Sequence, residues 1–123
     1  MYRKIDESMT NVLGFKLSGE LTTDEIEAMA GEIAATIEDC GKIRLVLEIE
    51  DLQEAPEVLS LAVDHSFASR FDNRVERMAC LADPKWRRWW DKLAATFVTT
   101  ATMFFTPNQR QAGLDWIRAG RPD

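Results

Sequence analysis

The clearest strand in the chain reads Ile43-Arg44-Leu45-Val46-Leu47-Glu48-Ile49-Glu50, and the architecture can be worked out from it. A large aliphatic side chain occupies every second position, beginning at Ile43 and ending at Ile49. Successive side chains of a strand point to opposite faces, so this spacing gathers the large groups on one face. The pattern predicts a strand over Lys42 to Leu52 with one apolar face.

Two strands are predicted before it. Tyr2 to Glu7 can form a short first strand, and Val12 to Ser18 predicts a second, in which every second residue from Leu13 to Leu17 is large and apolar. Asn11 lies between them and suits a turn, because its side chain can hydrogen-bond to the local backbone. The first two strands are therefore predicted to form a hairpin.

A helix is predicted between the hairpin and the strand over Lys42 to Leu52. Thr22 is followed three residues later by Glu25, which is the pattern of a capping box, and Gly41 follows Cys40 as a natural helix end. The apolar residues of this segment keep the helical period: Ile26, Met29, Ala30, Ile33 and Ile37. Its acidic residues are expected to face water.

Helices and strands alternate in the rest of the chain. A second helix is predicted to begin at Pro56, and a strand is predicted over Val75 to Leu81. A third helix is predicted to begin at Asp83-Pro84, and the later part of Phe97 to Phe105 suits a last strand. A last helix is predicted to begin at Thr106-Pro107 and to run through Leu114, Trp116 and Ile117. The order is β-β-α-β-α-β-α-β-α. We therefore expect an α/β fold with a mixed, mostly parallel sheet of about five strands and about four helices.

Composition limits the class of protein. The 123 residues are predicted to form one domain, 1–123, and a net charge of −6 argues against nucleic-acid binding. Cys40 and Cys80 have no metal-ligand spacing and are expected to be free thiols of a reducing compartment. Without a signal peptide or a run of about 20 apolar residues, the protein is expected to be cytoplasmic, or at most peripheral to the inner membrane.

The segment Lys85-Trp86-Arg87-Arg88-Trp89-Trp90-Asp91-Lys92-Leu93 is the most unusual in the chain. At helical pitch the apolar side chains fall on one stripe, made of Trp86, Trp89, Trp90, Leu93 and Phe97. Basic side chains fall together on the far side: Lys85, Arg88 and Lys92. Such a stripe packs on a sheet, lines an apolar pocket or a lipid interface, or forms a dimer interface.

Binding of an apolar small molecule or lipid is the first functional hypothesis. Trp86, Trp89, Trp90 and Phe97 would face Leu59, Val63 and Phe67 on the apolar side of the second helix. Arg87 and Arg88 would meet anionic headgroups during reversible, peripheral membrane contact. Methionine is an adaptable filler of such a space, and the chain offers Met9, Met29, Met78 and Met103.

Catalysis is not expected. The single histidine, His65, adjoins Asp64, but adjacent residues of a helix point about 100° apart and form no ready dyad. Cys80 lies in an apolar strand, where a thiol is inert. Carboxylates are abundant without metal-ligand spacing, so no catalytic residue, metal or cofactor is predicted.

Several segments occur in an order that resembles a known family: Ile43–Glu48, Asp64, Arg74–Ala79, Lys85–Leu93, Phe104-Phe105 and Gln111–Ile117. The chain resembles the STAS domains of anti-sigma-factor antagonists and, more closely, the SpoIIAA-like proteins, a bacterial family of about this length. The resemblance implies a STAS-like fold, akin to the lipid-binding CRAL-TRIO domain, and apolar-ligand binders that associate with membranes.

One departure from the antagonists concerns regulation. They carry a phosphorylatable Ser after the central strand, whereas Glu50 to Pro56 contains no hydroxyl group. The resemblance therefore implies a second hypothesis, a STAS-type module for protein–protein interaction or regulation that works without this switch. A homodimer formed through the tryptophan patch is a further alternative.

Overall fold

The structure is a computed structural model, and it describes residues 2–5, 11–20, 22–52 and 70–119. The helix predicted from Pro56 lies outside these ranges, together with Leu59, Val63 and Phe67. Asp64, His65 and Met9 also lie outside the described residues.

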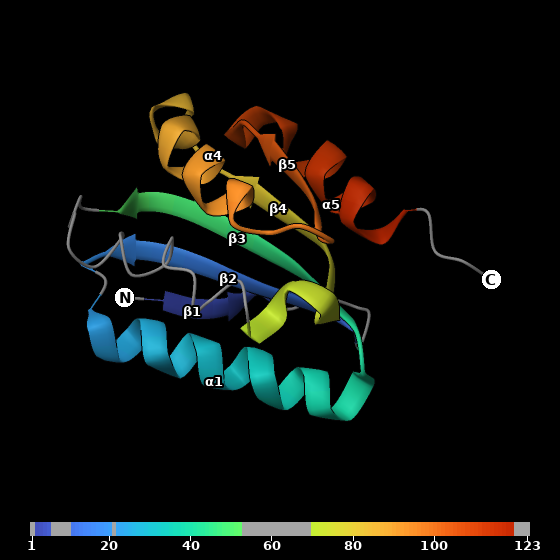
Figure 1. The fold of residues 1–123 in the computed structure, drawn as a ribbon. Helices are drawn as coiled ribbons and strands as arrows, with labels where there is room; N and C mark the ends of the chain where they lie inside the picture. Colours follow the sequence, from blue (N-terminus) through green and yellow to red (C-terminus); the bar gives the residue numbers. More distant parts are fainter. Residues whose placement is uncertain (1, 6–10, 21, 53–69, 120–123) are drawn as a thin grey trace.

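The described elements follow the predicted order (Figure 1). The strands are β1 (Tyr2–Ile5), β2 (Val12–Gly19), β3 (Ile43–Leu52), β4 (Val75–Leu81) and β5 (Ala101–Phe105). The α-helices are α1 (Thr23–Cys40), α4 (Arg87–Ala95) and α5 (Arg110–Arg118), and the short 3₁₀ helices are η1 (Asp72–Arg74), η2 (Pro84–Trp86) and η3 (Pro107–Gln109).

The five strands form one sheet in the order β1-β2-β3-β4-β5. β1 pairs antiparallel with β2, which confirms the hairpin, and the other neighbouring strands pair in parallel. The predicted α/β fold with a mixed, mostly parallel sheet is therefore confirmed. Three α-helices are described where about four were expected, because the second predicted helix falls within residues 53–69.

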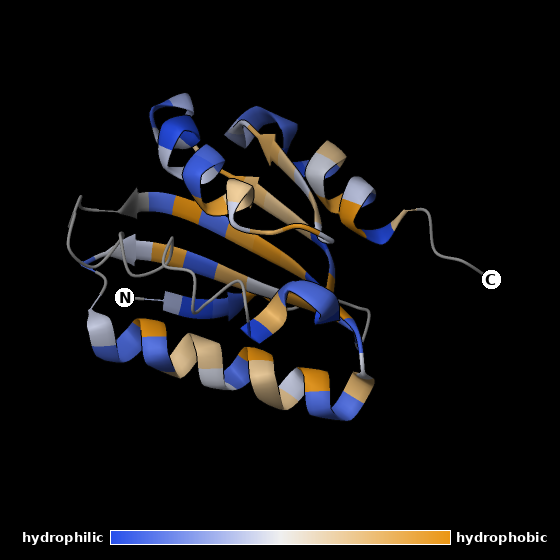
Figure 2. Ribbon diagram, in the orientation of Figure 1, coloured by the Kyte–Doolittle hydropathy of each residue, from blue (hydrophilic) through white to orange (hydrophobic). Residues whose placement is uncertain are grey.

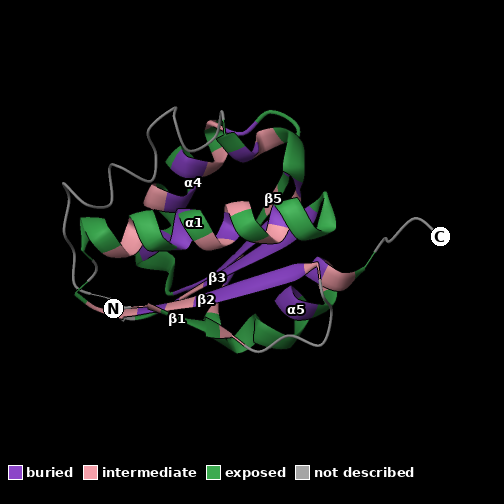
Figure 3. Ribbon diagram, turned by 90° about the horizontal axis from the view of Figure 1, so that it is seen from below, coloured by how far each residue is buried: buried purple, intermediate pink, exposed green. Residues whose placement is uncertain are grey.

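Helices cover both faces of the sheet (Figure 3). α1 and α4 lie on one face, where their apolar side chains form a single core with alternate residues of β2, β3 and β4. α5 lies on the opposite face and builds a smaller core, which includes Val46, Ala79 and Leu81 from the strands and Leu114 and Ile117 from the helix. Because β3 and β4 are covered on both faces, most of the side chains described in Ile43–Glu50 and Val75–Leu81 are buried.

Local signals set the ends of α1. Thr22 and Glu25 form the predicted capping box, with the Thr22 hydroxyl accepting from the Glu25 backbone and the Glu25 carboxylate accepting from the Thr22 backbone. Gly41 ends the helix with φ of 86°, a conformation that glycine adopts without steric cost. Met29, Ala30, Ile33 and Ile37 are buried, as their spacing predicted.

The tryptophan helix packs on the sheet. Trp86, Trp90, Leu93 and Phe97 are all buried in the core that α4 shares with α1. Trp89 is half-buried and packs against the same core, so it belongs to the stripe but lies at its margin. At 3.6 residues per turn, Trp89 lies about 60° from Trp86, on the boundary between the core and the solvent.

α5 approaches β4 closely because Gly113 has no side chain. A Cβ added there would lie 2.7 Å from Leu81 Cδ2 and 3.2 Å from Phe105 Cδ2. Ala79 is a fully buried small residue of the same core. The missing side chain of Gly113 lets the helix lie directly against Leu81 and Phe105.

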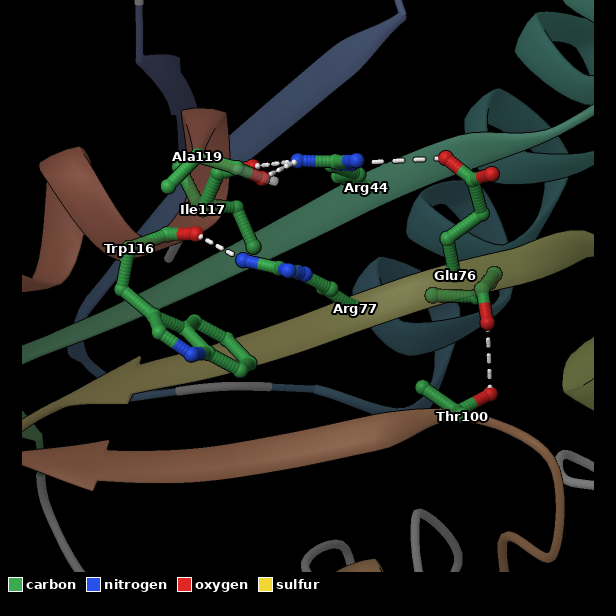
Figure 4. A network of polar contacts seen from close by, with 8 residues as sticks. Arg44, Glu76, Arg77, Thr100, Trp116, Ile117 and Ala119 are labelled. Atoms are coloured by element: carbon green, nitrogen blue, oxygen red, sulfur yellow. Dashed lines mark hydrogen bonds and ion pairs between the residues drawn. The ribbon is translucent and has the colours of Figure 1, made fainter. Parts of the chain in front are cut away.

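A buried arginine fixes the end of α5 (Figure 4). Arg44 on β3 is 3% exposed, and its Nη1 donates to the carbonyl oxygens of Ile117 at 2.8 Å and of Ala119 at 2.6 Å. Its Nε donates to Glu76 Oε1 on β4 at 3.3 Å. The last carbonyls of a helix lack partners within the helix and carry partial negative charge, so the guanidinium satisfies both needs.

A second arginine acts on the same helix end. Arg77 Nη1 donates to the carbonyl oxygen of Trp116 at 2.6 Å, and its guanidinium lies 5.1 Å from the centre of the Trp116 ring. The β3–β4 register shifts here, since Ile43 pairs with Val75 but Arg44 pairs with Arg77. The extra residue is Glu76, and the bulge lets the consecutive side chains of Glu76 and Arg77 both join the network.

Two glycines in helices provide a first prediction. Gly113→Ala should lower the free energy of unfolding by about 1–2 kcal/mol, because overpacking against Leu81 exceeds the gain in helix propensity. Gly31→Ala in α1 should raise it by up to about 1 kcal/mol, since no atom lies within 4 Å of the added Cβ. Urea unfolding of both variants checks this, and equal effects at the two sites would contradict the close approach of α5.

The buried arginine gives a second prediction. Arg44→Met should cost about 2–4 kcal/mol of stability, because it removes the α5 cap and leaves Glu76 without its buried partner. Arg74→Met is the matched control, and at its exposed position we expect a change within about 0.5 kcal/mol. Thermal unfolding followed by circular dichroism measures both. A neutral Arg44→Met would show that the network contributes little.

Candidate interaction surface

The outer face of η2 and α4 carries the basic side chains that the helical spacing predicted. Lys85, Arg88 and Lys92 are all exposed, and we call these three residues the basic face. The 3₁₀ helix η2 leads into α4. Asp83 caps the start of η2, and its Oδ1 accepts a hydrogen bond from the Lys85 backbone N–H at 3.0 Å. The hydrophilic colour of most of α4 is visible in Figure 2.

Trp89 borders the basic face. It lies four residues after Lys85 and three before Lys92, and residues at these spacings are neighbours on a helix surface. Its ring packs edge-on against buried Trp86, with ring centroids 6.2 Å apart. The indole is thus held against the core, and the residue is half-buried beside the basic face.

On the flank of α4, a positive charge is paired with a negative one. Arg87 and Asp91 form an exposed i,i+4 ion pair with Nε and Oδ1 3.1 Å apart. The Arg87 guanidinium also lies 5.3 Å from the centre of the Phe104 ring on β5. The positive charge of Arg87 is therefore offset by the negative charge of Asp91.

The charges of α1 and α4 are opposite in sign. α1 contains acidic residues and no Lys or Arg between Thr23 and Cys40, whereas the basic face gathers three cations in a protein of net charge −6. Both helices lie on the same side of the sheet (Figure 3). A surface with such separated potentials orients an approaching charged partner.

The predicted ligand-binding residues are placed differently from one another. Trp86, Trp90 and Phe97 come together in the core, and Trp89 and Arg88 reach the surface. Among the predicted fillers, Met29 and Met78 are buried. Met103 is 41% exposed on β5, so its prediction as a filler is wrong, because an edge strand leaves alternate side chains in water.

A cavity of about 570 Å³ opens at the amino-terminal end of β4, lined by Lys42, Asp72, Asn73, Val75, Glu76 and Thr99. Asp72 is committed to structure, since its carboxylate accepts from the backbone N–H groups of Val98 and Thr99 at 2.9 Å. Burial by itself would raise the pKa of Asp72, but these bonds and the hydroxyls of Thr99 and Thr100 hold the pKa below its usual value. Sequence patterns gave no sign of this loop anchor.

The Cys80 thiol is buried in β4. Burial raises the pKa of the Cys80 thiol to about 12, which keeps it protonated and unreactive. Within residues 2–5, 11–20, 22–52 and 70–119, no three His, Cys, Asp or Glu side chains gather as metal ligands would. None of the helices in these ranges combines the length and apolar character needed to cross a bilayer.

Comparisons with known proteins agree on the fold. An uncharacterized protein with a SpoIIAA-like fold from Shewanella loihica PV-4 matches the structure with a TM-score of 0.66, over 95% of this chain and 92% of that chain. The two sequences are 16% identical, so this likeness concerns the fold alone. No curated protein matches the chain in sequence. The family model described as SpoIIAA-like matches residues 12–118, from β2 to the end of α5, and the chain therefore belongs to the SpoIIAA-like family.

Proposed function

We propose that the protein is a non-catalytic interaction module that binds an acidic protein partner through the basic face of α4. The observation that carries this proposal is the half-buried Trp89 between Lys85 and Lys92, on an otherwise acidic protein. The module is of the STAS type, and we place it in the cytoplasm on the basis of its free cysteines.

The composition of this surface suits protein recognition. Tryptophan and arginine dominate the binding energy of many interfaces, and a tryptophan already held on one side loses little freedom on binding. Trp89 is held in this way by Trp86, and Arg88 lies on the same face. The exposed cations speed the approach of an acidic partner, an effect that salt weakens.

The proposed module has no serine switch of the antagonist type. The segment from Glu50 to Pro56 offers no hydroxyl group, and its charge is already negative. Control of binding then depends on the amount of protein and partner, or on the ionic environment of the basic face.

Site-specific photocrosslinking in living cells of the source organism tests the proposal. Ala95 is exposed at the end of α4 beside Lys92, and a benzoylphenylalanine placed there leaves every charge intact. We expect one dominant protein adduct, reduced about tenfold or more by Arg88→Glu with Lys92→Glu, since about 1.4 kcal/mol corresponds to a factor of ten.

The matched control places the same probe at Ala28, which is exposed on α1. Its adduct pattern should differ, and it should not respond to the charge reversals on α4. Identical adducts from both positions, or no adduct from Ala95, would contradict the proposed surface.

Binding of an apolar or lipid-like ligand is the second candidate. It is supported by the position of Trp89 beside Arg88, which suits an anionic headgroup, and by the kinship with CRAL-TRIO domains that the family resemblance implies. Trp86, Trp90 and Phe97 would have to leave the core to line an apolar site, with Leu59, Val63 and Phe67 opposite. Opening this core requires the exposure of several large side chains, each worth about 1.5–3 kcal/mol.

Tryptophan fluorescence distinguishes the two candidates. With vesicles of phosphatidylglycerol or phosphatidylcholine, the interaction module should keep its emission maximum unchanged, because its indoles remain where they are. A blue shift with phosphatidylglycerol alone that disappears in Trp89→Phe would assign the surface to lipid. A shift that Trp89→Phe preserves would instead report opening of the core around Trp86 and Trp90.

A further inference from the structure

β5 forms one edge of the sheet. The strand order ends with β5, and no strand among the described residues pairs with its outer side. The backbone carbonyl of Phe105 accepts from the N–H of Ala82, so the polar backbone groups of Phe105 point inward to β4. In an extended strand these groups alternate in direction, and those of Thr102 and Phe104 therefore point outward.

Apolar side chains are exposed on β5 and just before it. The described residues include two exposed large hydrophobic side chains, Val98 at 86% and Met103 at 41%, and both lie on β5 or just before it. No charged residue occurs between Lys92 and Arg110. Figure 2 shows the strand in largely hydrophobic colours beside the hydrophilic helix α4.

This edge lacks the charges, prolines and bulges by which natural sheets commonly protect their edges. Such protection consists of a lysine or proline within the edge strand, a bulge, or an inward-pointing charge. β5 reads Ala101-Thr102-Met103-Phe104-Phe105, without charge or proline, and its register with β4 is regular throughout. By contrast, the opposite edge strand β1 carries Arg3 and Lys4. One edge strand of the sheet is thus charged and the other is uncharged.

We propose that β5 pairs antiparallel with β5 of a second copy of this chain, about a two-fold axis at Met103. In this register Thr102 faces Phe104 of the partner subunit, and the two residues exchange backbone hydrogen bonds. The same exchange occurs on the other side of the axis, so every outward backbone group of the pairs is satisfied. Thr102 and Phe104 also form a cross-strand pair of β-branched and aromatic side chains, a favourable combination.

The uncharged sequence around β5 is compatible with a second copy as the occupant. Two copies each carry a net charge of −6 and repel at most orientations, but the interval between Lys92 and Arg110 brings no like charges together. A strand centred on Met103 is self-complementary, because the residues that point outward lie symmetrically on its two sides. This dimer lies on the sheet edge and is distinct from the basic face proposed above.

Disulfide trapping tests the register. In a Cys40→Ser background, Met103→Cys places two thiols at a non-hydrogen-bonded antiparallel pair, where Cα atoms lie about 4.5 Å apart and a disulfide can form. Ala101→Cys is the matched control on the same strand and face, and its two copies would lie more than about 12 Å apart. We expect covalent dimer from Met103→Cys at least about tenfold faster than from Ala101→Cys, given that difference in reach.

Sedimentation equilibrium of the unmodified chain provides the second measurement. Its average mass should rise with concentration up to about 1 mM, the range of weak association near −4 kcal/mol. Met103→Lys should remain monomeric, because it sets two ammonium groups against each other at the axis. Its circular dichroism spectrum should be unchanged, since Met103 is part-exposed. A chain that stays monomeric throughout, or equal trapping at positions 101 and 103, would overturn the proposal.

Discussion

The buried charge of Arg44 is the constraint on which the rest of the structure depends. A guanidinium at 3% exposure is tolerated only when its donors are paired, and its partners come from β4 and from the end of α5. One side chain thereby ties the central strand to its neighbour and to the helix on one face of the sheet. α5 has nine residues, too few for a helix to be stable alone, so capping by Arg44 and Arg77 and the close packing of Gly113 hold it in place. These residues belong to the segments that carry the resemblance to SpoIIAA-like proteins, so part of that resemblance reflects the packing of α5 on the sheet.

The regular parts of this scaffold could be predicted because local chemistry determines them. The capping box of Thr22 and Glu25 and the alternation from Ile43 to Ile49 follow from nearest neighbours, and both are confirmed. Strict alternation in β4 would have placed Glu76 on the face of Met78, yet the bulge directs it to Arg44. A bulge depends on pairing across strands, which no single segment reveals. The exposure of Met103 is equally invisible in sequence, because it depends on β5 being the last strand of the sheet.

The candidate site was predictable only in part, for a geometric reason. The spacing of Lys85 and Lys92 identified a basic side of the tryptophan helix, and both are exposed. The same spacing treated Trp86, Trp89 and Trp90 as one stripe. An apolar stripe is about 100° wide on a core-facing helix. How much of a residue on its boundary is buried depends on the surface against which the helix packs. Trp89 occupies that boundary, so its half-burial required the packed structure to be seen.

The two proposed surfaces have a consequence together that neither has alone. A two-fold axis at Met103 that pairs two edge strands within one sheet stands perpendicular to that sheet, so both copies of α4 lie on the same side. α4 covers the sheet next to β5, as the contact between Arg87 and Phe104 shows, so the two basic faces are brought near one another. A partner with two acidic segments could then bind both at once, with the second contact made at a high effective concentration. Weak pairing of the β5 edges would therefore be strengthened by the partner itself, because a ligand that bridges both copies favours the dimer by mass action.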